Sequence, residues 1–142
     1  MKSLLIMMIF TGAGFIASAQ SPLGIWKTID DETGIAKSHV KIFETKDGKL
    51  QGQIIKILDP EKQNATCIEC TGDKKDKPVK GMVILWGLSK DGDEWSGGQV
   101  LDPVNGKQYK CFIKLKGANQ LELRGYIGFR RFGRTQMWQR VE

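Results

Sequence analysis

The sequence predicts an all-β protein, and three observations lead to that prediction. Apolar and polar residues alternate with a period of two from residue 25 to residue 141, as in strands that bury one face. No stretch sustains the i, i+3, i+4, i+7 apolar spacing of an amphipathic helix. Turns rich in Gly, Asp, Asn and Pro interrupt the alternation repeatedly, as they do between antiparallel strands.

Eight segments have this alternating pattern. In the segment 36–43, the even-numbered residues are apolar or small and share one face. The odd-numbered residues, two lysines, a histidine and a phenylalanine, share the other face. In order, the predicted strands are 25–30, 36–43, 50–58, 82–88, 94–101, 107–116, 121–126 and 135–141.

Most connections between these strands are short turns, at 31–34, 46–49, 90–93, 102–106 and 117–120, and a Gly- and Arg-rich segment at 128–134 precedes the last strand. The exception is 59–80, which contains almost no large apolar residue. We expect it to form a long surface loop without a packed element. A loop of this length is unusual in a compact domain and is often functional.

Eight antiparallel strands in sequential order close most economically into an up-and-down barrel, because closure removes the exposed strand edges. A two-sheet sandwich is the alternative. An eight-stranded barrel is either filled by its own side chains or holds one small ligand. The sequence pattern is compatible with both.

Residues 1–19 are typical of a secretory leader. Lys2 gives the positive start, 4–10 are an unbroken apolar run, and A-S-A at 17–19 is a cleavage signal. A membrane anchor needs roughly 20 apolar residues, and polar or glycine residues interrupt this run well before that length. We therefore expect a signal peptide that is cleaved before Gln20, with no transmembrane segment afterwards.

The remaining residues, 20–142, are enough for one barrel domain with its own core. The whole chain has a net charge of +6, or +5 without the leader, which carries one lysine. This charge favours anionic neighbours in the cell envelope, such as lipid headgroups or acidic glycans. We expect a periplasmic or secreted protein, and export argues against a nucleic-acid partner.

The two ends of the predicted barrel share a pattern. Gly24-Ile25-Trp26 opens the first strand, and Trp138-Gln139-Arg140 lies in the last. This arrangement resembles the lipocalin-like barrel, in which a G-x-W tryptophan closes the floor beneath an arginine of the final strand. The resemblance implies structural roles for Gly24, Trp26, Trp138 and Arg140. Such an arginine–tryptophan contact contributes about 0.5–2 kcal/mol.

Six motifs extend over nearly the whole mature chain: G-I-W-K-T at 24–28, G-M-V-I-L-W-G-L at 81–88, W-S-G-G at 95–98, D-P-V-N-G-K-Q-Y at 102–109, L-R-G-Y-I-G at 123–128 and G-R-T-Q-M-W-Q-R at 133–140. Together they resemble a bacterial family of small exported proteins that is catalogued as a domain of unknown function. The resemblance implies a lipocalin-like barrel in the periplasm and supplies no substrate or catalytic residue.

The three cysteines favour a structural role. Cys67 and Cys70 form a C-x-x-C motif, but thiol–disulfide exchange usually places such a motif at a helix N-terminus beside a βαβ unit, and neither is predicted here. We expect a local disulfide that pins the long loop. Cys111 lies in mid-strand and is typical of a small buried apolar residue. A bridge from Cys111 to either of the other two, or a redox role, is the alternative.

Catalytic and metal chemistry lack their usual residues. A closed zinc site needs four ligands, and the chain has one C-x-x-C and the single histidine His39. There is no G-x-S-x-G motif, and the acidic clusters lie in turns. We therefore expect no metal, no cofactor and no catalytic residues, and favour a binding protein over an enzyme.

The aromatic residues are the better functional clue. A barrel mouth lined by rings, with a guanidinium beside them, suits a small hydrophobic or amphipathic ligand with an anionic end. The alternative is a filled, ligand-free envelope protein that uses its basic loops, 74–80 and 130–134, on anionic surfaces or partners. The candidate ligand-binding residues are Trp86, Trp95, Tyr109, Arg124 and Tyr126.

Overall fold

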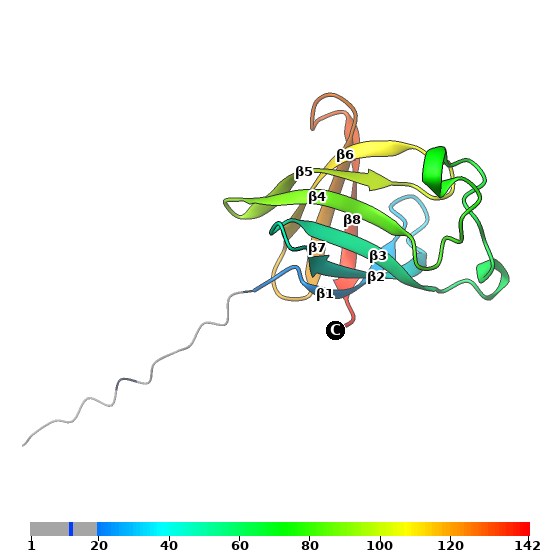
Figure 1. Ribbon diagram of the computed structural model, residues 1–142. Helices are drawn as coiled ribbons and strands as arrows, with labels where there is room; N and C mark the ends of the chain where they lie inside the picture. The colour runs from blue at the N-terminus through cyan, green and yellow to red at the C-terminus, as the bar shows by residue number, and fades with distance from the viewer. Residues whose placement is uncertain (1–11, 13–19) are drawn as a thin grey trace, which may run out of the picture.

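The chain folds into a closed barrel of eight antiparallel strands (Figure 1). The structure is a computed structural model that describes residue 12 and residues 20–142. Each strand pairs with its neighbours in sequence, and β8 returns to pair with β1. The predicted leader, 1–19, lies outside the described residues except for Gly12. The strands are β1 (Gly24–Ile29), β2 (Ala36–Glu44), β3 (Leu50–Ile57), β4 (Val83–Asp91), β5 (Glu94–Leu101), β6 (Gln108–Leu115), β7 (Gln120–Tyr126) and β8 (Gly133–Arg140).

The barrel confirms the predicted fold class and rules out the sandwich. The predicted strand 94–101 has the same bounds as β5, and most of the others differ by one or two residues. The largest difference is at the end of β4, which we predicted to turn at 90–93. Lys90 and Asp91 instead continue the strand, and only Gly92 and Asp93 form the turn. Two-residue hairpin turns of this kind match the natural twist of paired strands.

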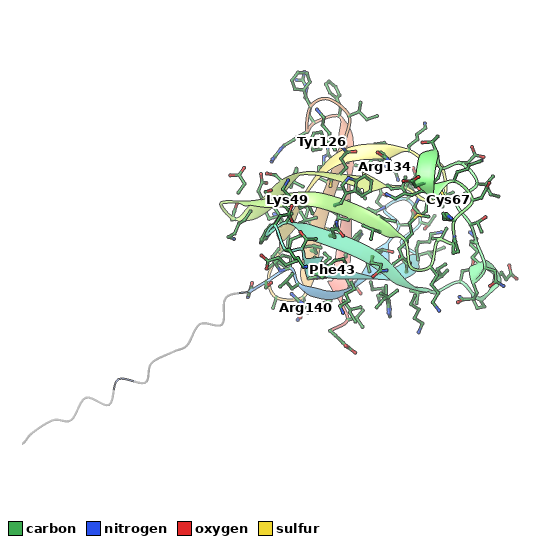
Figure 2. The ribbon with its side chains drawn as sticks, viewed as in Figure 1. Phe43, Lys49, Cys67, Tyr126, Arg134 and Arg140 are labelled. Carbon is green, nitrogen blue, oxygen red and sulfur yellow. A yellow bond between two sulfur atoms is a disulfide. The ribbon has the colours of Figure 1, made fainter. Side chains whose placement is uncertain are left out.

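Two ends of the barrel can be distinguished by their connections. The loop end carries the four longer connections, 30–35, 58–82, 102–107 and 127–132. The turn end carries the tight turns 45–49, 92–93 and 116–119, together with the beginning of β1 and the end of β8. Figure 2 shows this separation, because Cys67 of the loop end and Arg140 of the turn end lie on opposite sides of the barrel.

The inner face of the barrel is densely packed. Several of its side chains expose no surface at all, so no space large enough for a water molecule, open or enclosed, adjoins them. This packing leaves no room for a ligand among them, which favours the filled barrel over the hollow one. The fully enclosed side chains are Trp26, Val40, Leu50, Leu85, Leu88, Cys111, Ile113 and Leu121.

Residues 58–82, which we call the strap, do not form the unpacked surface loop that we predicted. They contain two short 3-10 helices, Pro60–Lys62 and Gly72–Lys74, and lie against the outside of the barrel (Figure 1). Beneath them, Ile84 and Leu101 are 6% and 2% exposed, although both follow the alternation that points them outward. The strap therefore covers a second apolar layer outside the barrel wall.

The prediction for the strap failed because its apolar contribution comes from cysteines. Cys67 and Cys70 are joined in a disulfide, with 5.3 Å between their Cα atoms. They are 0% and 3% exposed and belong to the same buried cluster as the barrel core. A disulfide is compact and apolar, so it replaces the large hydrocarbon side chains that the segment lacks.

Candidate functional site

The turn end of the barrel holds a hollow with a volume of about 430 Å³. Trp95 of β5 and Leu115 of β6 form its apolar wall, and both lie on the strand faces that point into the barrel. Lys90 of β4 and Asp93 of the following turn form its polar rim. The remaining wall is the chain segment that precedes β1, residues 20–22.

The β4–β5 hairpin places the aromatic ring and the ammonium side by side. Lys90 and Trp95 are directly paired across the two strands, so their side chains extend from the same face. The Lys90 Nζ atom lies 5.5 Å from the centroid of the Trp95 ring. A cation and an apolar ring are thereby held together at the edge of the hollow.

The charges around the hollow leave Lys90 as its available cation. The Asp93 carboxylate accepts a hydrogen bond from Lys114 at 3.0 Å, which lowers the pKa of Asp93 and raises the pKa of Lys114. Asp93 is therefore already compensated by a lysine outside the hollow. Within residues 20–142, Lys90 forms no ion pair with any carboxylate.

Trp26 and Arg140, the pair that resembles the lipocalin-like arrangement, hold the chain segment before β1 in place. The Arg140 guanidinium lies 4.3 Å from the Trp26 ring and donates hydrogen bonds to the carbonyls of Ser21, Leu23 and Ala118. The Trp26 indole N–H donates to the carbonyl of Pro22 at 2.8 Å. These contacts hold the segment across the turn end, where it bounds the hollow.

Gly24 is required by this closure. Its φ is +129°, and a Cβ atom there would lie 2.4 Å from the carbonyl oxygen of Glu142. Only glycine adopts this backbone conformation without strain.

Trp138 is also buried, at 2% exposure, and its indole N–H donates to Gln136. All four residues of the predicted structural set therefore lie in or beside the closing contacts of the barrel.

The structure does not bring the five candidate ligand residues together. Trp95 lies at the turn end, whereas Tyr109 lies near the loop end beside Val100. Trp86 and Arg124 lie on the outer face, because each adjoins inward-facing residues in strand alternation. The barrel mouth that we expected from them is therefore absent.

Two of these residues have contacts of their own. Lys74 of the strap places its Nζ atom 3.9 Å from the centroid of the Trp86 ring and covers it. Arg124 donates to the carbonyls of Arg130 and Arg131 and to the Thr135 hydroxyl, and so supports the connection between β7 and β8. Tyr126 lies at the base of that connection (Figure 2) and is partly buried.

The basic loops are partly neutralised within the chain. Arg130 is paired with Glu94, and Arg134 with Asp31 and Glu32. The strap contributes a second, shallower hollow of about 340 Å³, with three lysines around an apolar floor. Its lining residues are Lys74, Lys77, Pro78, Lys80, Gly81, Met82 and Val83.

The free thiol and the possible metal ligands of the described residues bear on whether the chain holds a reactive site. Cys111 is a buried free thiol whose pKa is raised to about 12 by burial, and a thiol that stays protonated is a poor nucleophile. In the part of the chain that the structure describes, no three His, Cys, Asp or Glu side chains gather to hold a metal. That part also contains no helix with the length and apolar character needed to cross a membrane.

Sequence reasoning missed Lys90 and residues 20–22 as parts of a site. We assigned Lys90 to a solvent-exposed turn, and its pairing with Trp95 became visible only with the register of the β4–β5 hairpin. A signal was present in the sequence. Asp-Gly-Asp permits a two-residue turn around Gly92, and that turn would have placed Lys90 directly opposite Trp95.

Comparison with known proteins gives a family and a fold. The family model described as "Uncharacterized protein conserved in bacteria (DUF2147)" matches residues 24–140. Among solved structures, the chain is similar to the protein HP1028 from Helicobacter pylori, which is described as belonging to the lipocalin family. The TM-score is 0.76 at 22% identity, over 87% of this chain and 84% of that one. None of the curated proteins compared with the sequence matches it.

Proposed function

We propose, for a chain that belongs to the bacterial family of uncharacterized proteins DUF2147, that it binds a small amphipathic molecule with an anionic group. The proposed site is the hollow at the turn end. The observation that carries the proposal is the pairing of the Trp95 ring with the Lys90 ammonium at the edge of that hollow.

The dimensions and lining of the hollow suit such a ligand. Its volume of about 430 Å³ lies within the range of roughly 300–1,000 Å³ that is typical of small-molecule sites. Trp95 and Leu115 would enclose an alkyl or aromatic portion, and Lys90 would form a charge-assisted hydrogen bond with a carboxylate or phosphate. Because Asp93 is paired with Lys114, it competes little with the ligand for Lys90.

The dense barrel core supports this location. Eight-stranded barrels can hold a small ligand in their interior, but eight inner side chains of this barrel are fully enclosed and leave no adjoining space. A ligand would therefore bind at the end of the barrel, against the inner-facing Trp95 and Leu115. The contacts of Arg140 with residues 21 and 23 keep the third wall of the site in place.

The proposal includes export to the periplasm or the cell exterior, and the leader-like residues 1–19 motivate it. Cleavage before Gln20 would place a new α-ammonium group at the wall of the hollow, since Gln20 is one of its lining residues. A second cation there would favour an anionic ligand further. N-terminal sequencing of protein secreted by its host tests this step, and a chain that begins at Met1 would contradict it.

The strap supports a second candidate function, binding to an anionic polymer of the envelope. Among the described residues, none of the three lysines of its shallow hollow forms an ion pair with a carboxylate. Pelleting with peptidoglycan at low and high salt tests this function. Binding that is lost in Lys77→Gln with Lys80→Gln, and at high salt, would support it.

Calorimetric titration with dodecanoate tests the main proposal. We expect Lys90→Gln to raise the dissociation constant at least tenfold. The control is Lys49→Gln, at an exposed lysine in another turn of the same end (Figure 2), and it should change the dissociation constant by less than twofold. Dodecanol, which has the same chain without the charge, should bind the native protein and the Lys90 variant equally. Equal dodecanoate affinity in all three proteins, or no binding at all, would contradict the proposal.

A further inference from the structure

The connection between β7 and β8 exposes an unusual amount of apolar surface. We call residues 127–132 the hairpin tip. Ile127, Phe129 and Phe132 in this tip are 68%, 70% and 56% exposed. The tip projects beyond the ends of the strands at the loop end of the barrel (Figure 1). Three large apolar side chains exposed within six residues mark an interaction site more often than an ordinary surface.

Side-chain contacts hold the tip in the conformation that exposes these apolar residues. Arg124 donates to the carbonyls of Arg130 and Arg131 from below. Arg130 lies 4.2 Å from the Phe112 ring and makes two hydrogen bonds to the Glu94 carboxylate, at 2.7 and 3.1 Å. These contacts fix the backbone of the tip against the barrel wall, so the apolar side chains are presented outward.

The charge of the tip is positive. Its six residues include two arginines and no carboxylate. Glu94 neutralises Arg130, whereas Arg131 has no ion-pair partner among the described residues. The Arg131 guanidinium lies 4.8 Å from the Phe132 ring, and the rings of Phe129 and Phe132 are 6.3 Å apart. The tip thus combines two neighbouring aromatic rings with an unpaired guanidinium.

We propose that the hairpin tip inserts shallowly into the interfacial region of an anionic lipid bilayer. Phe129, Phe132 and Ile127 would enter the boundary between headgroups and acyl chains, and Arg131 would contact lipid phosphates. Apolar side chains bind this boundary through the apolar area that they bury, and arginine binds it through attraction to anionic lipids.

A bilayer fits the tip better than a protein partner or a second copy of the chain. A stable protein interface buries roughly 800 Å² on each partner, which is more than three side chains on a six-residue turn provide. A bilayer has no such requirement, because it closes around a small inserted group. The unpaired Arg131 also complements the negative surface charge of anionic lipids.

This inference does not depend on the proposed ligand site, which lies at the other end of the barrel. The tip belongs to the loop end, and the hollow is lined by residues 20–22, 90, 93, 95 and 115 of the turn end. Binding of the tip to a membrane would leave the hollow accessible to ligand. The two proposals can therefore fail separately.

Vesicle flotation of residues 20–142, the chain without the expected leader, tests the inference. The vesicles contain either phosphatidylcholine alone or phosphatidylcholine with about 30 mol% phosphatidylglycerol, an anionic lipid whose negative surface potential attracts basic segments. We expect the native protein to float with anionic vesicles at low salt, more weakly at high salt, and weakly with neutral vesicles. Phe129→Ser with Phe132→Ser should reduce the bound fraction at least tenfold, and Arg131→Gln severalfold.

Val104→Ser is the matched control. Val104 is 81% exposed in the 102–107 loop of the same end, and its substitution should leave flotation unchanged. Thermal unfolding of each variant should match the native protein, because the substituted side chains are mostly exposed. Absence of flotation at low salt, or equal flotation of the double variant, would overturn the inference. Cross-linked dimers that depend on Phe129 would also overturn it, in favour of a second copy.

Discussion

At the scale of single residues, Arg140 joins separate segments of the chain at the turn end of the barrel. It contacts the Trp26 ring and three backbone carbonyls from two separate segments of the chain. The G-x-W motif and the terminal arginine were visible in the sequence, and the resemblance implied their contact. The three carbonyl partners were not predictable, because they depend on the path of residues 21–23 and 118.

Replacing Arg140 should destabilise the fold. Arg140→Ala removes three charge-assisted hydrogen bonds and one cation–π contact, and we expect the free energy of unfolding to fall by about 2–4 kcal/mol. Urea unfolding followed by tryptophan fluorescence measures this change. Lys41→Ala, an exposed lysine on β2, is the control and should change stability by less than about 0.5 kcal/mol. A loss of similar size in both variants would contradict a closing role for Arg140.

Cys111 should make stability fall at alkaline pH. Its pKa is raised to about 12 by burial, whereas a thiol in the unfolded chain ionises near pH 8.5. Above that pH the unfolded state loses a proton that the folded state keeps, so the free energy of unfolding decreases as pH rises toward 12. The expected slope is about 1.4 kcal/mol per pH unit at most.

Urea titrations at pH 7, 9 and 10.5 check this dependence, with Cys111→Ala as the reference that removes the thiol and keeps the other titrating groups. The native protein should lose more stability than the variant between pH 9 and 10.5. The Cys111 thiol should also be unreactive toward a thiol reagent in the folded protein and react only once the chain unfolds. Rapid reaction at pH 8 in the absence of urea would contradict the burial of Cys111.

At the scale of elements, the strap shows where reasoning from sequence reached its limit. Its composition indicated an exposed loop, and its two short helices and its packing were not expected. One of its contacts is between Glu69 of the strap and Gly106 of the neighbouring turn, where a Cβ atom would lie 2.0 Å from the Glu69 carbonyl oxygen. Contact between segments 37 residues apart has no local signal in either of them.

Gly106→Ala should therefore loosen the strap. Both Gly106 and Gly92 have positive φ, at +72° and +63°, but only Gly106 has a neighbour within 4 Å. We expect Gly92→Ala to cost roughly 1 kcal/mol, from backbone strain alone. Gly106→Ala should cost more than about 2 kcal/mol, because the strap must also move.

Limited proteolysis with trypsin separates the two variants, because the strap contains five lysines. Cleavage within the strap should accelerate in Gly106→Ala and stay at the native rate in Gly92→Ala. Equal cleavage rates would mean that the strap is not held by this contact.

At the scale of the whole molecule, the sequence predicted the architecture well and named one residue of the proposed site, Trp95. Strand order and closure followed from alternation, turn residues and the need to remove exposed edges, and all of these are local or topological signals. The choice between a filled and a hollow barrel depends on the volumes of side chains from every strand. The candidate site depends on the β4–β5 register, which placed Lys90 beside Trp95 and left Trp86 and Arg124 outside.

The central claim is that an amphipathic anion binds at the turn end of the barrel beside Trp95. The indole N–H signals of the four tryptophans in an ¹⁵N–¹H correlation spectrum, recorded during titration with dodecanoate, test it most directly. We predict that the Trp95 signal shifts with saturation, while those of Trp86 and Trp138, which do not line the hollow, stay within the line width. The Trp26 indole, whose N–H donates to the wall residue Pro22, should shift less than Trp95. A shift confined to Trp86, or equal shifts of all four signals, would contradict binding at the turn-end hollow.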